Sequence, residues 1–186
     1  MITGSFSKGY LGAVRWDGIK SNLHLYGAEL SKEIRGALKE HGIKGVSVKC
    51  KTFSGGQEIT VTVKPADGEV ESLTDYREHA RIEDMACNGS LWFEKEQRYV
   101  EMEEYLLCSK EKQEEVFNDV SEWHYKRETS GSMLQGYIDS CISFSDALKD
   151  KIRLINDIVR MYNYEDINSV ADYCNTNFYY DIRLKK

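Results

Sequence analysis

The sequence has 186 residues, with 25 Lys and Arg against 31 Asp and Glu, 41% hydrophobic residues and a net charge of −6. This composition excludes global disorder and predicts a soluble, folded chain that needs neither a metal nor a disulfide for its stability. It contains no apolar run of about 18 residues and no secretory pattern at its start, so we expect a cytoplasmic protein without membrane contact.

Charge is distributed unevenly along the chain. Residues 1–65 carry ten basic and five acidic side chains, whereas residues 66–186 carry fifteen and twenty-six. The only proline, Pro65, lies at the change of sign and is followed by a turn-forming sequence. We therefore expect a single domain with three parts: a basic helix–hairpin part over 1–65, an acidic helical part over 66–144 and a helix–strand ending over 145–186.

The first predicted elements are a helix and a β-hairpin. Residues 29–41 place apolar side chains at helical spacing, and Gly42 follows as a stop signal. Apolar and polar residues then alternate over 46–51 and again over 59–64, on either side of Ser54-Gly55-Gly56. Such alternation across a glycine-containing connection predicts an antiparallel hairpin over about 45–64.

The middle of the chain, from 70 to 127, has a helical and polar pattern. We expect one helix from Val70 to Ala80, a second around Tyr99 to Leu106 after a break at Gly89, and a third through Val116 and Trp123. The stretch 129–140 contains two glycines, which predict irregular structure.

The last forty residues predict a helix and a strand. Ser145 is a suitable helix cap, Leu148 to Tyr162 repeat at helical spacing, and Phe178, Tyr180, Ile182 and Leu184 alternate with polar residues. We expect the strand, over about 176–184, to join the hairpin. The fold class is thus α+β: a small, mostly antiparallel sheet packed by several helices.

Two blocks resemble a known family. The block KEIRGALKE leading into VSVKCKTFSGGQEITVTV, within residues 29–64, looks like the helix–hairpin unit of the large polyvalent protein-associated domains. The ending LINDIVRMYNYEDINSVADYCNTNFYYDI is similar to the way such proteins finish. These domains occur in phages, plasmids and integrative elements, beside counter-defence and mobilisation proteins. The two blocks cover under half of the chain, and the stretch 70–140 has no such resemblance.

An acidic product of a mobile element with fewer than 200 residues is similar, in size and charge, to anti-CRISPR proteins that inhibit type II-A effectors. The resemblance thus implies an inhibitor of a Cas9-type nuclease in the cytoplasm of a bacterial host, with the effector and its guide RNA as partners. Two alternatives stay open: effector-dependent, ribonuclease-like trimming of the guide RNA, and an accessory protein- or DNA-binding module of a phage or conjugative element.

Three lysines are candidates for nucleic-acid binding. Lys49, Lys51 and Lys64 are expected on the outward face of the hairpin, among serine and threonine hydroxyls. Such a face can neutralise phosphates and release their counterions. A solvated sheet face is the alternative.

Acidic residues in the segment 94–128 are candidates for partner binding, because carboxylates at phosphate-like spacing can occupy a basic nucleic-acid channel. The segment holds eleven acidic and six basic residues. Its crowded members are Glu101, Glu103, Glu104, Glu111, Glu114 and Glu115. Exposed helix faces with i, i+4 charge pairs are the ordinary alternative.

Catalytic candidates are few. His124 beside Arg127 is a weak candidate for the acid–base chemistry that guide-RNA trimming needs. The five cysteines and four histidines are scattered without ligand spacing, so we expect reduced thiols, no metal and no cofactor. Near the end, alternation places Tyr179 on the outer face, where it is a candidate partner contact, alone or with Tyr164.

Overall fold

A computed structural model describes residues 3–168 and 173–185. The chain forms two compact units: unit 1 contains residues 1–65, 132–139 and 147–186, and unit 2 contains residues 66–131 and 140–146. We expected one domain in three parts; the first break between the units falls after Pro65, where the charge of the sequence changes sign.

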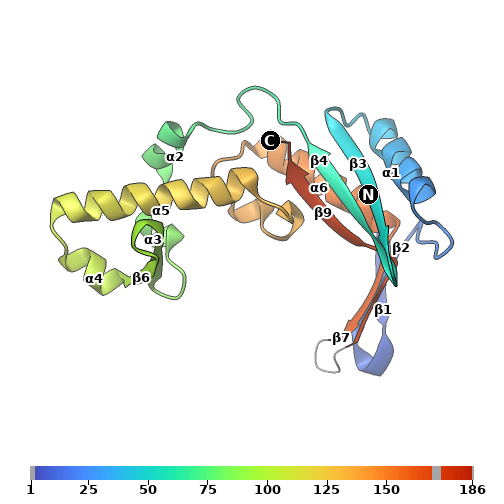
Figure 1. Ribbon diagram of the computed structural model, residues 1–186. Helices are drawn as coiled ribbons and strands as arrows, with labels where there is room; N and C mark the ends of the chain where they lie inside the picture. Colours follow the sequence, from blue (N-terminus) through green and yellow to red (C-terminus); the bar gives the residue numbers. More distant parts are fainter. Residues whose placement is uncertain (1–2, 169–172, 186) are drawn as a thin grey trace. The chain divides into compact units, whose positions relative to one another are not determined.

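The central sheet of unit 1 has the strand order β3-β4-β9 (Figure 1). Strands β3 (Val46–Phe53) and β4 (Gly56–Val63) form the expected hairpin, which turns at Ser54-Gly55, with Gly55 at a φ of 87°. Strand β9 (Tyr179–Leu184) joins the hairpin as predicted and pairs in parallel with β4. The α+β fold class expected from the sequence is therefore confirmed.

Two helices contribute buried side chains to the core of unit 1, α1 (Ala28–Glu40) and α6 (Asp146–Met161). The apolar stripe of α1 packs next to β3, and Tyr180 of β9 donates a hydrogen bond to Asn156 of α6 at 2.8 Å. Both helices thus cover the face of the sheet that carries Ile59, Val61 and Ile182, which are fully buried (Figure 1). The opposite, open face carries the polar residues of each strand.

A second sheet of unit 1 was not predicted. Strands β1 (Gly4–Lys8), β2 (Val14–Gly18), β7 (Tyr164–Asn168) and β8 (Tyr173–Thr176) form an antiparallel sheet in the order β1-β2-β7-β8. Trp16 attaches this sheet to α6, because its indole Nε1 donates to the carbonyl of Arg160 at 3.1 Å and its ring lies 4.2 Å below that guanidinium.

The stretch 129–140, expected to be irregular, is so only after residue 130, where the long helix of unit 2 ends; it contains the 3₁₀ turns η3 (Leu134–Gly136) and η4 (Ile138–Ser140). The side-chain amide of Gln135 in η3 pairs with the outer edge of β9. Its nitrogen donates to the carbonyl of Tyr180 at 3.1 Å, and its oxygen accepts from the N–H of Ile182 at 3.0 Å. The Gln135 side chain thus forms the hydrogen bonds with these backbone groups of β9 that a further strand would form.

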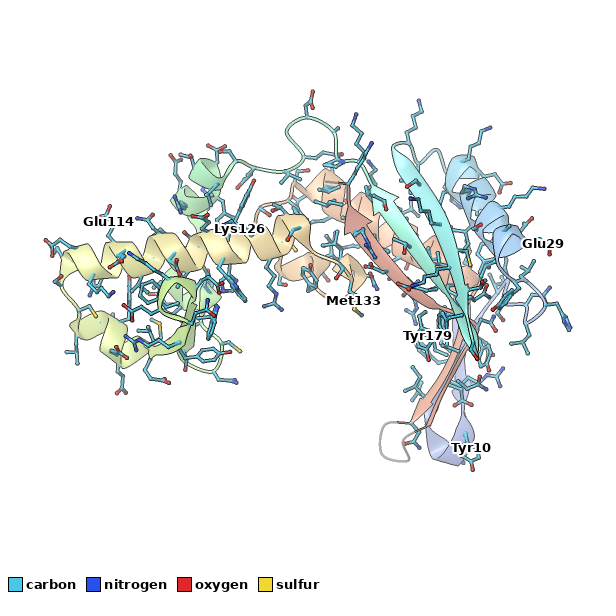
Figure 2. The ribbon with its side chains drawn as sticks, in the orientation of Figure 1. Tyr10, Glu29, Glu114, Lys126, Met133 and Tyr179 are labelled. Carbon is cyan, nitrogen blue, oxygen red and sulfur yellow. The ribbon has the colours of Figure 1, made fainter. Side chains whose placement is uncertain are left out.

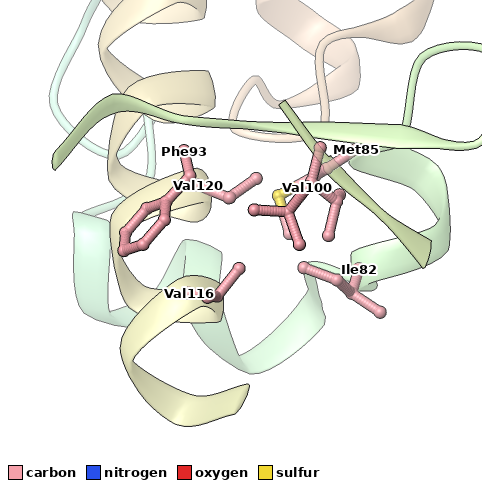
Figure 3. Packing of buried hydrophobic residues seen from close by; sticks show 7 residues of the cluster. Ile82, Met85, Phe93, Val100, Val116 and Val120 are labelled. Atoms are coloured by element: carbon pink, nitrogen blue, oxygen red, sulfur yellow. The ribbon is translucent and has the colours of Figure 1, made fainter. Parts of the chain in front are cut away.

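Unit 2 is built around the long helix α5 (Lys110–Ser130). Short helices α2 (Leu73–His79), α3 (Ile82–Met85) and α4 (Met102–Leu107) pack beside it, together with a hairpin of β5 (Ser90–Phe93) and β6 (Arg98–Glu101). Figure 3 shows the core of this unit. Its buried members are Ile82, Met85, Leu91, Phe93, Val100, Val116 and Val120.

The helix predicted from Tyr99 to Leu106 is confirmed only from Met102 onward, as α4; its first part was wrong, because Tyr99 lies in β6. Leu91 and Phe93 point into the core and Trp92 does not, which is the alternation of a strand. The connection contains Gln97 in the left-handed region at a φ of 53°. Two four-residue strands separated by a charged turn are too short to outweigh the helical pattern around them.

Among the described residues, no helix combines the length and the apolar character needed to cross a membrane.

Candidate functional site

Two of the three predicted lysines meet on the open face of the central sheet. Lys49 and Lys64 line a hollow of about 430 Å³, together with Lys185, which sequence reasoning missed. Ser47 and Thr62, opposite each other in the register of β3 and β4, add hydroxyl groups to the same hollow.

The position of Lys185 follows from the parallel pairing of β9. Arg183 lies beside Thr62 in the register, and the N–H of Lys185 donates to the carbonyl of Val63 at 2.7 Å, so residue 185 continues the open-face row. Within the described part of the chain, the ammonium groups of Lys49, Lys64 and Lys185 have no carboxylate partner. Three unpaired cations at one hollow attract a polyanion.

Lys51, the third predicted lysine, lies away from this hollow. It is exposed and stands opposite Glu58 in the register of the hairpin. The cationic hollow therefore consists of Lys49, Lys64 and Lys185.

The acidic residues of unit 2 do not form one continuous negative surface. Glu96, Glu104 and Glu115 alternate with Lys95, Arg98 and Lys112 in a chain of ion pairs; Arg98 pairs with Glu104 and Glu96 at 2.8 Å each, and Lys112 pairs with Glu96 at 2.8 Å. Hydrogen bonds from Arg98 lower the pKa of Glu104, and those from Lys95 and Lys112 lower the pKa of Glu115. The predicted residues Glu104 and Glu115 are therefore neutralised within the unit.

The other four predicted glutamates have different surroundings. Glu101 accepts a hydrogen bond from the Ser90 hydroxyl at 2.9 Å. The pKa of Glu111 is lowered by its own backbone N–H and by Ser109, at the start of α5. In the described structure, Glu103 and Glu114 are exposed and have neither an ion pair nor a hydrogen bond, which leaves them available to a partner.

Exposed apolar side chains accompany Glu103 on α4. Leu106 and Leu107 are 65% and 88% exposed. Gln113 of α5 donates to the carbonyls of Tyr105, Leu106 and Cys108, so the end of α4 is held against the first turns of α5. Sequence reasoning missed these leucines, although they interrupt an otherwise polar segment.

His124 has the environment of a structural residue. Its ring meets that of Trp123 edge-on at 4.9 Å between centroids. Burial lowers the pKa of His124 and the nearby charge of Arg127 adds to this, while a hydrogen bond with the Met85 backbone opposes it. The neighbouring carboxylate of Glu122 pairs instead with Lys126 at 2.6 Å and Arg77 at 3.6 Å. The geometry thus supplies His124 with no acid–base partner among these residues.

Free thiols occur in both units in the part that the structure describes. Cys50, Cys87, Cys108 and Cys141 are free thiols. No group of three His, Cys, Asp or Glu side chains in the described residues is arranged to hold a metal ion.

The two tyrosines proposed as partner contacts differ. Tyr179 lies on the open face as predicted, with 52% of its surface exposed, and its ring stacks on Phe53 with centroids 6.3 Å apart. Tyr164 is buried, and the Arg15 guanidinium lies 5.0 Å from the centre of its ring. Tyr164 is therefore not a surface contact.

Charge follows the two units closely. Unit 1 contains 17 basic and 12 acidic residues, a net charge of +5, although its residues come from both ends of the sequence. Unit 2 contains 8 basic and 19 acidic residues, a net charge of −11. The net charges of the two units are therefore opposite in sign.

Comparisons of the chain with family models, with curated proteins and with solved structures each gave no match.

Proposed function

We propose that the protein is an anti-CRISPR inhibitor that binds a type II, Cas9-type effector nuclease, or its guide-RNA complex, and blocks nucleic-acid engagement. The observation that carries the proposal is the division of charge, with +5 on unit 1 and −11 on unit 2. The resemblance of residues 29–64 to domains of mobile elements supports the same class of function.

The charges match the surfaces of such a complex. An effector of this type holds its guide–target duplex in a positively charged channel, which attracts an anionic body. On unit 2, Glu103 and Glu114 would contact that channel. On unit 1, the cationic hollow of Lys49, Lys64 and Lys185 would contact guide-RNA phosphates. Inhibition by this route needs binding and no bond-making by the inhibitor.

A cleavage assay tests the proposal. Purified effector, guide RNA and a labelled target DNA are mixed with increasing amounts of the protein, added either before or after the target. We expect cleavage to fall as the protein concentration rises, and to fall further when the protein is added before the target. Target cleavage at an undiminished rate in excess protein would contradict the proposal and favour an accessory module of a mobile element.

The guide RNA from the same reactions separates blocking from trimming. On a denaturing gel, we expect guide of full length in every lane. Shortened guide that is lost with His124→Ala would instead support effector-dependent trimming, and would assign chemistry to a residue that the geometry leaves without a carboxylate partner.

A further inference from the structure

A second hollow of unit 1 differs in character from the cationic hollow. It has a volume of about 670 Å³ and lies beside the first residues of β9. Its lining comes from both sheets and from the segment that contains η3: Glu58 from β4, Glu165 and Ile167 from β7, Tyr179 from β9, and Met133 just before η3. Its volume is within the range of sites that bury a small ligand or a few side chains.

The η3 side of this hollow is held in a defined conformation. Met133 has a φ of 59° and a ψ of 36°, a left-handed conformation that is unfavourable for a residue with a long side chain. Its N–H donates to the buried carboxylate of Asp181, and Gln135 bonds to β9 through both atoms of its amide. Several hydrogen bonds thus maintain a strained residue at the rim, which is typical of functional positions.

Apolar groups are exposed around the hollow. Met133 is 59% exposed, Ile167 47% and Tyr179 52%, and Phe53, which stacks on Tyr179, is 43% exposed. Figure 2 labels Met133, just before η3, and Tyr179 of β9, both of which line the hollow. Methionine and aromatic side chains gathered at one exposed place are typical of protein-binding surfaces.

The charge of the lining is opposite to that of the unit. Asp181 and Arg183 pair with each other, which leaves Glu58 and Glu165 as the carboxylates of the lining without an ion pair in the described structure, with Lys51 opposite Glu58 in the register of the hairpin. Across the described residues Glu58 has no hydrogen bond or ion pair, and Glu165 accepts one hydrogen bond, from Asn163. Two carboxylates repel a phosphate backbone and attract a cationic side chain.

We propose that this hollow binds a short segment of a partner protein in which a basic residue, Arg or Lys, adjoins an apolar one. The basic side chain meets Glu58 and Glu165, and the apolar side chain packs among Met133, Ile167 and Tyr179. The inference goes beyond the proposed function, since it needs neither a nuclease nor a guide RNA.

A labelled peptide with alternating arginine and leucine, Gly-Arg-Leu-Arg-Leu-Arg-Gly, provides the test. We expect saturable binding in fluorescence anisotropy at 150 mM salt, with weaker binding of the Gly-Arg-Ser-Arg-Ser-Arg-Gly peptide because it lacks the apolar groups. Amide NMR signals of Met133, Ile167 and Tyr179 should shift on addition of the first peptide. Shifts confined to the acidic helices of unit 2 would show non-specific charge attraction and overturn the proposal.

Variants locate the contact further. Glu58→Gln should weaken binding of the arginine–leucine peptide at least threefold, and Glu58→Lys and Tyr179→Ala at least tenfold. Glu40→Lys makes the same charge change at an exposed position at the end of α1 and should leave binding within twofold. Equal effects of Glu58→Lys and Glu40→Lys would contradict the assignment. If Tyr179→Ala weakens binding of a 20-nucleotide RNA and leaves peptide binding unchanged, the hollow binds nucleic acid and the proposal is wrong.

Discussion

The side-chain oxygen of Gln57 accepts a hydrogen bond from the N–H of Gly27 at 2.8 Å. Gln57 lies near the start of β4, and its amide nitrogen also donates to the carbonyls of Leu25 and Asn177, at 3.2 and 3.4 Å. Gly27, at a φ of 61°, immediately precedes α1 without a side-chain cap. One buried amide therefore connects the segment before α1, the sheet and the residue after β8.

Gln57→Leu should destabilise unit 1, because it leaves the partners of the amide without hydrogen bonds at a position that is 2% exposed. We expect a loss of about 1–3 kcal/mol in the free energy of unfolding, measured by urea denaturation. Thr60→Val, on the open face of the same strand, should change it by less than about 0.5 kcal/mol. A loss no larger than that of the control would show that water replaces the amide at little cost.

Lys64→Ala with Lys185→Ala should weaken binding of a labelled 20-nucleotide single-stranded RNA. Because each phosphate contact releases counterions, the slope of log K against log salt should become shallower by about 0.7 for each lysine removed. Lys32→Ala with Lys39→Ala, on α1, removes the same charge and should alter the slope less. An unchanged slope for the first pair would exclude the cationic hollow as the RNA contact.

Glu103→Lys with Glu114→Lys should raise the concentration needed for half-inhibition of the effector at least tenfold and reduce the dependence of inhibition on salt. Both residues are unpaired in the described structure, so their reversal disrupts no ion pair. Glu78→Lys with Asp84→Lys gives the same change of charge on α2 and α3. Equal losses from the two pairs would assign inhibition to the overall charge of unit 2.

Glu104→Gln with Glu115→Gln should have little effect: the concentration needed for half-inhibition should stay within twofold of that of the unaltered protein. These side chains pair with Arg98, Lys95 and Lys112, and their charge is already compensated. A titration in the cleavage assay measures the effect. A loss of inhibition as large as that of the Glu103 and Glu114 pair would mean that the ion-pair chain itself faces the partner.

Acidification should destabilise unit 2 through His124. Burial lowers the pKa of His124 in the folded state below its ordinary value of 6.5, so the unfolded chain binds the proton more readily. The free energy of unfolding is therefore unaffected by His124 above pH 6.5, where the imidazole is neutral in both states, and it decreases as the pH falls from 6.5 toward the folded-state pKa. Between pH 8 and 5, the melting temperature should fall less for His124→Gln than for the unaltered protein. Equal falls in the two proteins would show that His124 is not the origin of the pH dependence.

The sequence predicted those parts of the fold whose pattern is long and local. Helices α1 and α6 and the hairpin β3–β4 have many residues in period with their surroundings, and they were correctly identified. The sheet β1-β2-β7-β8 was missed because its strands are four or five residues long, and its apolar face leaves Phe6 and Val14 more than 60% exposed. Short exposed strands have a weak pattern, and their pairing depends on residues far apart in the chain.

The candidate site was predictable only one strand at a time. Alternation placed Lys49 and Lys64 on the open face and Tyr179 on the outer side of its strand, and the structure agrees. The partners Lys185 and Met133 depend on the parallel register of β9 and on the return of residues 132–136 to its edge. No local pattern encodes either relationship.

The pairing of β4 with β9 has a consequence for synthesis on the ribosome. The two strands are neighbours in the sheet, but residues 64–178, including all of unit 2, are translated between them. The nascent hairpin β3–β4 must therefore wait with one side of β4 unpaired until residues 179–184 have left the exit tunnel. A chain released before residue 184 would leave the edge of β4 that β9 covers unpaired and open to pairing with a strand of another chain.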